Sequence, residues 1–192
     1  MRKHKVNLPS LLKSDDWSLF LDRDGVINQR LVDDYVKNTN EFQFTDGFTR
    51  ALSDLTPFFK HIVVVTNQQG IGKGLMSEAA LSTIHQHMIA ECNKEGGRID
   101  HVFYCPDLKE SRSLNRKPNI GMGLQARKAF PRIRFNRSVM AGDSLSDMEF
   151  GRKLKMVTVF IDNGDPSPLP DHLADFRFKT FSEFAKWLTG NL

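Results

Sequence analysis

Residues 19 to 26, LFLDRDGV, constrain the fold of this chain more than any other stretch. Three consecutive apolar residues, Leu19 to Leu21, suit a strand buried on both faces, as in a parallel sheet. Side chains alternate along a strand, so the carboxylates of Asp22 and Asp24 leave its end on the same side. Two like charges held that close repel unless a divalent cation or a shared proton intervenes. The stretch predicts a Mg²⁺ site at the end of a buried strand, although a solvated turn can carry the same pair by chance.

Later segments repeat the pattern of a strand that ends in polar groups. Ile62 to Val65 are β-branched without a break before Thr66 and Asn67, and SVMAGD ends at Asp143. Further strands are predicted at 101–105 and 156–162, with an edge strand near 175–178. Helices are predicted over about 47–60, 77–95, 120–130 and 145–154, and at the C-terminus. This alternation predicts an α/β fold with a doubly wound, mostly parallel sheet.

The length and composition fit one domain. With 192 residues, of which 40% are hydrophobic, the chain can bury a substantial core. We expect residues 17–192 to form this domain and residues 1–16 to be an extension that packs on it through Leu8, Leu11 and Leu12. The sequence shows no long apolar run and no apolar signal segment, so we expect a cytoplasmic protein with no membrane partner. Two cysteines, Cys92 and Cys105, fit free thiols in a reducing compartment.

Ligands of doubly wound sheets bind outside the carboxyl ends of the strands. Asp22, Thr66, Asn67 and Asp143 all lie at such ends and are expected to meet in one crevice. A carboxylate there can attack phosphorus, and phosphoryl transfer needs mainly positioning and cations. The site therefore predicts phosphoryl chemistry with Asp22 as the nucleophile.

The other roles follow from the requirements of that reaction. Asp24 would protonate the leaving oxygen and later accept a proton from water, which requires its pKa to lie above the ordinary aspartate value. Mg²⁺ would bind Asp22, the backbone carbonyl of Asp24, Asp143 and waters. Thr66 would hold phosphoryl oxygens and Lys117 would neutralise charge in the transition state. Asp147, one helical turn after Asp143, would orient this metal site.

Four motifs, DRDGV, VVVTNQ, RKP and GDSLSD, resemble in their order and spacing those of the haloacid-dehalogenase superfamily of phosphohydrolases. DRDGVIN, VVVTNQQGIGKG, YCP, RKPNIGM and AGDSLSDM further resemble the heptose bisphosphate phosphatases and their relatives, the histidinol-phosphate phosphatases. The resemblance covers roughly residues 17 to 165. It implies the same roles for Asp22, Asp24, Thr66, Lys117 and Asp143. The resemblance also implies that the substrate is contacted by residues in the range Arg30 to Asp33 and by Asn67, Gln68 and Arg116. Attack by Asp22 on phosphorus would form an aspartyl phosphate. The chain has no long insertion after the first motif or between the second and the third, so we expect a fold without a large cap domain.

The chain departs from this family in the loop after the third strand. Relatives often hold a structural zinc there with a C-x-H pair and a C-x-C pair. Here the corresponding stretches are Cys105-Pro106-Asp107 and Ser113-Leu114-Asn115. One thiolate is too few for a closed tetrahedral site, so we expect no zinc.

The sequence is compatible with more than one phosphatase function. The favoured function is the removal of the C7 phosphate of a heptose 1,7-bisphosphate, a small phosphorylated metabolite, by a monomer. The alternatives are a histidinol-phosphate phosphatase and, ranked below it, a polynucleotide 3′-phosphatase, since a net charge of +4 is only mildly basic. A phospho-aspartate switch would gain nothing from the carboxylate at position 24. The stretch QQGIGKG lacks the residues of a P-loop and is expected to be a loop over the site.

Overall fold

The computed structural model describes residues 7–12, 16–31, 34–163 and 169–192. Its centre is a sheet of six strands in the order β3-β2-β1-β4-β5-β6, and each of the five pairings is parallel. The α/β prediction is confirmed, and the sheet is parallel throughout. The strands are β1 (Ser18–Leu21), β2 (His61–Asn67), β3 (His101–Cys105), β4 (Ser138–Gly142), β5 (Val157–Ile161) and β6 (Phe176–Phe178).

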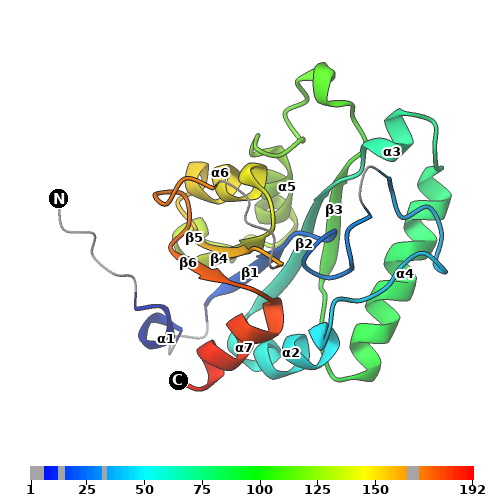
Figure 1. Cartoon of the computed structure of the whole chain (residues 1–192). Coiled ribbons are helices and arrows are strands. Elements are labelled where there is room, and N and C mark those ends of the chain that lie inside the picture. Colours follow the sequence, from blue (N-terminus) through cyan, green and yellow to red (C-terminus); the bar gives the residue numbers. More distant parts are fainter. Residues whose placement is uncertain (1–6, 13–15, 32–33, 164–168) are drawn as a thin grey trace.

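Helices cover both faces of the sheet (Figure 1). They are α1 (Leu8–Leu11), α2 (Phe48–Leu55), α3 (Gln69–Gly72), α4 (Glu78–Lys94), α5 (Gly121–Ala129), α6 (Leu145–Lys153) and α7 (Phe181–Thr189). Three 3₁₀ turns, η1 (Thr56–Phe58), η2 (Lys109–Ser111) and η3 (Phe135–Arg137), complete the connections. The predicted helix from Ser77 is α4, and the Ser77 side chain caps it by accepting a bond from the amide of Ala80.

The alternation of side chains along β1 divides the core into two layers. Leu19 and Leu21 pack in the cluster that includes residues of α2, α4 and α7. Phe20 points to the opposite face, in the cluster with residues of α5 and α6. All four residues of β1 are buried, which is why its sequence is apolar without alternation. The strand therefore stays fixed between two packed layers.

The strand order reverses beside β1, whose neighbours are β2 on one side and β4 on the other. Crevices form at such points because the connections on either side lead away from each other. The amide of Asp22 donates to the carbonyl of Ala141 at 2.9 Å, which holds the first residue after β1 against β4. The ends of β1 and β4 thus form one edge of the sheet, at which the predicted site residues lie.

Two other features bear on the predictions. Leu8 and Leu12 belong to the larger core cluster. The QQGIGKG stretch, predicted to be a loop, contains the helical turn α3. The amide of Gly72 donates to the carbonyl of Pro106 at 3.2 Å, so a contact with the segment after β3 supports this turn. Within the described ranges no separate cap domain follows β1 or β3, and no helix is long and apolar enough to span a membrane.

Candidate active site

The carboxyl ends of β1, β2 and β4 open into a cavity of about 430 Å³. Its wall combines acidic, basic and hydroxyl side chains, so it suits a polar, charged ligand. The sequence-predicted residues that line it are Asp22, Asp24, Arg30, Thr66, Asn67, Arg116, Lys117 and Asp143, and Asp147 joins them.

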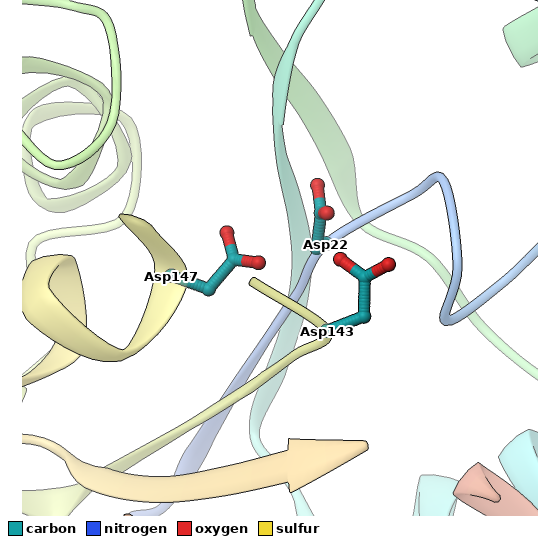
Figure 2. Close-up of side chains that lie close together, drawn as sticks. All are labelled: Asp22, Asp143 and Asp147. Carbon is teal, nitrogen blue, oxygen red and sulfur yellow. The ribbon is translucent and has the colours of Figure 1, made fainter. Parts of the chain in front are cut away.

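Three carboxylates from separate elements converge in this cavity (Figure 2). Asp22 follows β1, Asp143 follows β4 and Asp147 lies on α6, and one ligand oxygen from each lies within 4.8 Å of the others. Burial, followed by the charge of Asp147, raises the pKa of Asp22 to about 7. Burial and the charges of Asp22 and Asp147 raise the pKa of Asp143 to about 8. The cluster therefore holds negative charge that lacks a sufficient counter-charge.

Lys117 is a buried cation that contacts two members of this cluster. Its Nζ lies 2.7 Å from Oδ1 of Asp22 and 2.5 Å from Oδ1 of Asp147. The lysine is 3% exposed. Although burial opposes its charge, the two carboxylates raise its pKa, so it stays protonated. The ammonium thus lies directly beside the predicted nucleophile, as the sequence analysis expected.

Asp147 holds Lys117 in place. Its Oδ2 accepts bonds from the Ser144 amide at 3.0 Å and the Ser144 hydroxyl at 2.6 Å. The bond from the Ser144 amide and the bond from the Asp147 amide to the Ser144 hydroxyl oxygen together form the capping box of α6. Oδ1 of Asp147 faces Lys117. Asp147 was predicted to orient the metal site, and this role stays a prediction; in the structure its Oδ2 is bound at the helix cap and its Oδ1 lies beside Lys117.

Asn67 fixes the backbone from which Lys117 projects. Its Nδ2 donates to the Lys117 carbonyl at 3.1 Å, and its Oδ1 accepts from the Lys117 amide at 3.0 Å. This reciprocal pair ties the segment after η2 to the end of β2. Asn67 lines the cavity, but both polar atoms of its amide already have protein partners.

The carboxylate of Asp24 accepts hydrogen bonds from three neighbouring side chains. Oδ1 accepts from Arg23 Nη2 at 2.8 Å and Asn28 Nδ2 at 3.0 Å, and Oδ2 accepts from Gln68 Nε2 at 2.8 Å. Burial alone would favour the neutral acid, but the charge and hydrogen bonds of Arg23, with those of Asn28 and Gln68, lower the pKa of Asp24. The expectation that its pKa is raised is therefore wrong for this conformation, because the arginine between the two aspartates is its ion-pair partner.

The remaining predicted substrate contacts fall into three groups. Arg30 is exposed in the cavity wall, with Nη1 at 3.5 Å from Oδ2 of Asp143. Arg116 also lines the wall, and its Nη1 donates to the carbonyl of Asp107 at 3.1 Å. Gln68 is 1% exposed and donates to Asp24 and Thr66 beneath the cavity. Asp33 lies outside the described residues.

Two glycines give the carboxylates their room. Gly25 has φ +92°, and a Cβ on it would lie 2.0 Å from Oδ2 of Asp143. A Cβ on Gly142 would lie 2.3 Å from Cβ of Asp147. Both distances are far inside van der Waals contact, so larger residues would displace these aspartates.

The donor set fits Mg²⁺. The cation prefers hard oxygen ligands, and its charge would relieve the repulsion between Asp22 and Asp143. Because Oδ2 of Asp147 accepts bonds from Ser144 and Oδ1 is ion-paired with Lys117, Asp22 and Asp143 would supply the carboxylate ligands. Asp24 could contribute only its backbone carbonyl, since its carboxylate faces Arg23.

Side-chain contacts connect the residues of the loop after β3, where relatives often hold zinc. The thiol of Cys105 lies 3.5 Å from Oδ2 of Asp107 and 3.9 Å from Oγ of Ser113. The Asn119 side chain donates to the carbonyl of Ser113 at 2.9 Å. These contacts order the loop without a set of zinc ligands, and the absence of zinc stays a prediction.

Several residues around the site were not predicted from the sequence. Tyr35 and Ser144 line the cavity, as does Lys73, which belongs to the stretch QQGIGKG expected over the site but was given no role. Asn28 and His85 lie behind the cavity, in contact with Asp24 and Arg23 respectively. Tyr35 carried only a weak signal, because no strand end or helix cap marks its position.

The sequence matches a family model and several known phosphatases. A family model described as HAD-hydrolase-like matches residues 114–180. A D-glycero-alpha-D-manno-heptose-1,7-bisphosphate 7-phosphatase of Mycobacterium bovis is 43% identical over 138 residues, which cover 72% of this chain and 73% of that protein. A D-glycero-beta-D-manno-heptose-1,7-bisphosphate 7-phosphatase of Escherichia coli K12 is 34% identical over 176 residues, which cover 86% and 90%.

Solved structures agree in fold. The D,D-heptose 1.7-bisphosphate phosphatase from B. bronchiseptica, complexed with magnesium and phosphate, matches with a TM-score of 0.82 and 27% identity. The match covers 92% of this chain and 99% of that one. The similarity therefore extends over nearly the whole of both chains.

Proposed function

The chain belongs to the heptose bisphosphate phosphatase family of HAD-like hydrolases and is a phosphoric monoester hydrolase; from this premise we propose that it removes the C7 phosphate of D-glycero-D-manno-heptose 1,7-bisphosphate. The proposed reaction requires Mg²⁺ and proceeds through an aspartyl phosphate on Asp22. The reaction type rests on one contact above all, the 2.7 Å pairing of buried Lys117 with Asp22 at the end of the central strand. The substrate rests on the names of the relatives.

The first step forms the bond between Asp22 and phosphorus. A carboxylate oxygen of Asp22 attacks the phosphoryl group, and the bond from phosphorus to the sugar oxygen breaks. Lys117 and the hydroxyl of Thr66 bind the phosphoryl oxygens as negative charge spreads over them. Asp22 and Asp143 would hold Mg²⁺, which would supply further positive charge against the phosphoryl group.

Asp24 moves the protons. In the first step its carboxyl gives a proton to the departing sugar oxygen, so the sugar leaves as an alcohol. In the second step the Asp24 carboxylate takes a proton from the water that attacks the aspartyl phosphate, and Asp22 and phosphate are released. The present conformation favours the carboxylate and so suits the second step. The first step requires a protonated Asp24 that presents one carboxyl oxygen to the substrate while Arg23 and Asn28 hold the other.

We also propose a cytoplasmic monomer, with residues 17–192 as one domain. Cys92 and Cys105 are free and buried, which fits a reducing compartment. No zinc is expected in this protein. Its proposed partner is a small phosphorylated metabolite rather than nucleic acid.

A phosphate-release screen tests the proposed substrate. The substrates are the α and β anomers of the heptose bisphosphate, histidinol phosphate and a short 3′-phosphorylated oligonucleotide, each with Mg²⁺. We expect kcat/KM for one heptose bisphosphate to exceed that for the other two classes by at least about tenfold, or roughly 1.4 kcal/mol. Faster hydrolysis of histidinol phosphate or of the oligonucleotide would replace the proposal with that alternative.

Arg116→Ala should lower kcat/KM on the heptose bisphosphate. The lost transition-state stabilisation should be about 1.5 to 3 kcal/mol, which is what a hydrogen bond to a charged group contributes. The Arg116 guanidinium can bind the second phosphate with paired donors. An aryl phosphate without a distal phosphate should be affected far less. Lys109→Ala, which removes an exposed charge from the same loop, is the matched control. Equal losses on both substrates would assign Arg116 to the reacting phosphoryl group or to the loop itself.

Removing Mg²⁺ should abolish activity, and adding it should stabilise the protein more at pH 8 than at pH 5. Asp22 and Asp143 have pKa values of about 7 and about 8, against an ordinary value of 3.8, so the metal-free folded state retains protons that the unfolded chain releases. The free energy of unfolding of the metal-free protein should therefore fall as the pH rises from the ordinary aspartate pKa of 3.8 to about 8. Mg²⁺ binds the deprotonated form, and at 100 times its Kd it adds about 2.7 kcal/mol.

Thermal unfolding at the two pH values, with chelator or with Mg²⁺, measures both effects. Asp143→Asn serves as the control, because it should reduce both the pH dependence and the response to Mg²⁺. An equal rise in Tm at pH 5 and pH 8 would contradict the assignment of Asp22 and Asp143 as ligands.

A further inference from the structure

Arg23 is a buried charge between the two aspartates of the first motif. It is 1% exposed. Its Nη2 lies 2.8 Å from Oδ1 and 2.9 Å from Oδ2 of Asp24, and its Nε lies 3.3 Å from Oδ1. A guanidinium at this depth is costly unless its donors are satisfied. The partner of its remaining terminal nitrogen therefore affects where the guanidinium lies.

That partner is His85 on α4. Nη1 of Arg23 lies 3.4 Å from Nε2 of His85, which is 62 residues away in the chain and 7% exposed. A guanidinium only donates hydrogen bonds, so Nε2 accepts and the proton of the neutral ring is on Nδ1. Burial and the charge of Arg23 lower the pKa of His85 to about 3, which keeps the ring neutral. The ring of Tyr104 lies on another side of His85, with centroids 6.0 Å apart.

We propose that His85 is a positioning residue for the acid and base Asp24, acting through Arg23. This inference rests on the proposed function, in which Asp24 transfers protons. The imidazole anchors one end of the guanidinium, and the other end fixes the carboxylate of Asp24 between Asn28 and Gln68. Without the anchor the guanidinium can rotate, and the carboxylate moves with it. Proton transfer depends steeply on such placement.

The test compares two leaving groups. When the bond from phosphorus to oxygen breaks, its electrons go to the leaving oxygen, which in a sugar phosphate takes the proton of Asp24. A nitrophenolate leaves as a stable anion and needs no proton. We expect His85→Leu to lower kcat/KM on a sugar phosphate about tenfold, within the ~10² to 10⁴ that a positioned acid contributes. On nitrophenyl phosphate the loss should be less than about twofold.

Three matched variants accompany His85→Leu. His85→Gln supplies an acceptor oxygen and should recover most of the activity. His85→Phe retains a ring beside Tyr104 without an acceptor, so it should behave like His85→Leu and replaces it if the leucine variant does not melt cooperatively. His87→Leu changes the histidine two residues along α4, whose described ring contact is with Phe42, and should have no effect.

A double-mutant cycle with Arg23→Lys tests the route. If His85 acts through Arg23, His85→Leu should add little to the loss that Arg23→Lys causes alone. Additive losses, equal losses on the two substrates, or a glutamine variant no better than leucine would each overturn the proposal. The sugar phosphate used is any that the wild type hydrolyses, so failure on heptose bisphosphate would reject the proposed substrate and leave the His85 result independent.

Discussion

Asp22→Asn should lower phosphatase turnover by at least about 10⁴-fold, because removal of a catalytic nucleophile typically lowers kcat by this factor or more. An amide is a poor nucleophile and also a weaker metal ligand than a carboxylate. The fold should persist, because burial and the charge of Asp147 already destabilise the Asp22 anion. We therefore expect the Tm of the variant at pH 8 to equal or exceed that of the wild type.

Phosphate release and thermal melting test this result, and acid quenching of the wild type should trap a phosphoenzyme that the variant lacks. Asp171→Asn, at an exposed position, is the control and should be fully active. Near-normal activity of Asp22→Asn would reject the aspartyl-phosphate mechanism.

Lys117→Met should reduce both catalysis and stability. Loss of the ammonium removes a transition-state contact worth about 10² to 10³ in kcat. It also leaves two buried carboxylates, Asp22 and Asp147, facing each other without their shared cation. Breaking a buried ion pair in this way costs about 3 to 5 kcal/mol. The loss should be smaller at pH 5 than at pH 8, because Asp22, whose pKa is raised to about 7, is protonated at pH 5 and no longer repels Asp147.

Urea unfolding at the two pH values, combined with steady-state kinetics, measures both losses. Lys153→Met is the control: its Nζ donates to the Pro118 carbonyl at 3.0 Å from an exposed position, so its removal should change little. Adding Asp147→Asn to Lys117→Met should recover part of the stability but not the activity. No recovery would mean that the loss comes from packing rather than from charge.

The fold was largely predictable because its elements carry local signals. The β-branched run from Ile62 to Val65 lies within β2, and the strand predicted at 101–105 is β3. Helix α3 was not predictable, since its sequence QGIG contains two glycines. Its support comes from Pro106, which folding brings to it from the segment after another strand.

The residues that line the site were predictable from the sequence, but their hydrogen-bond and ion-pair partners were not. Strand ends brought Asp22, Thr66, Asn67 and Asp143 to one cavity, as expected. The sequence does not reveal which donor each carboxylate meets, because this depends on rotamers and packing across the sheet. Thus no role was predicted for Arg23, yet it lowers the pKa of Asp24.

The two glycines beside the carboxylates limit which related sequences can hold this site. A chain could retain every aspartate and the lysine at the same spacing, carry alanine at position 25 or 142, and still form the six-stranded sheet. Its carboxylates would not meet, because the added methyl groups would occupy positions beside Asp143 and Asp147. These two positions therefore limit the site by space alone, although glycine takes no part in the chemistry.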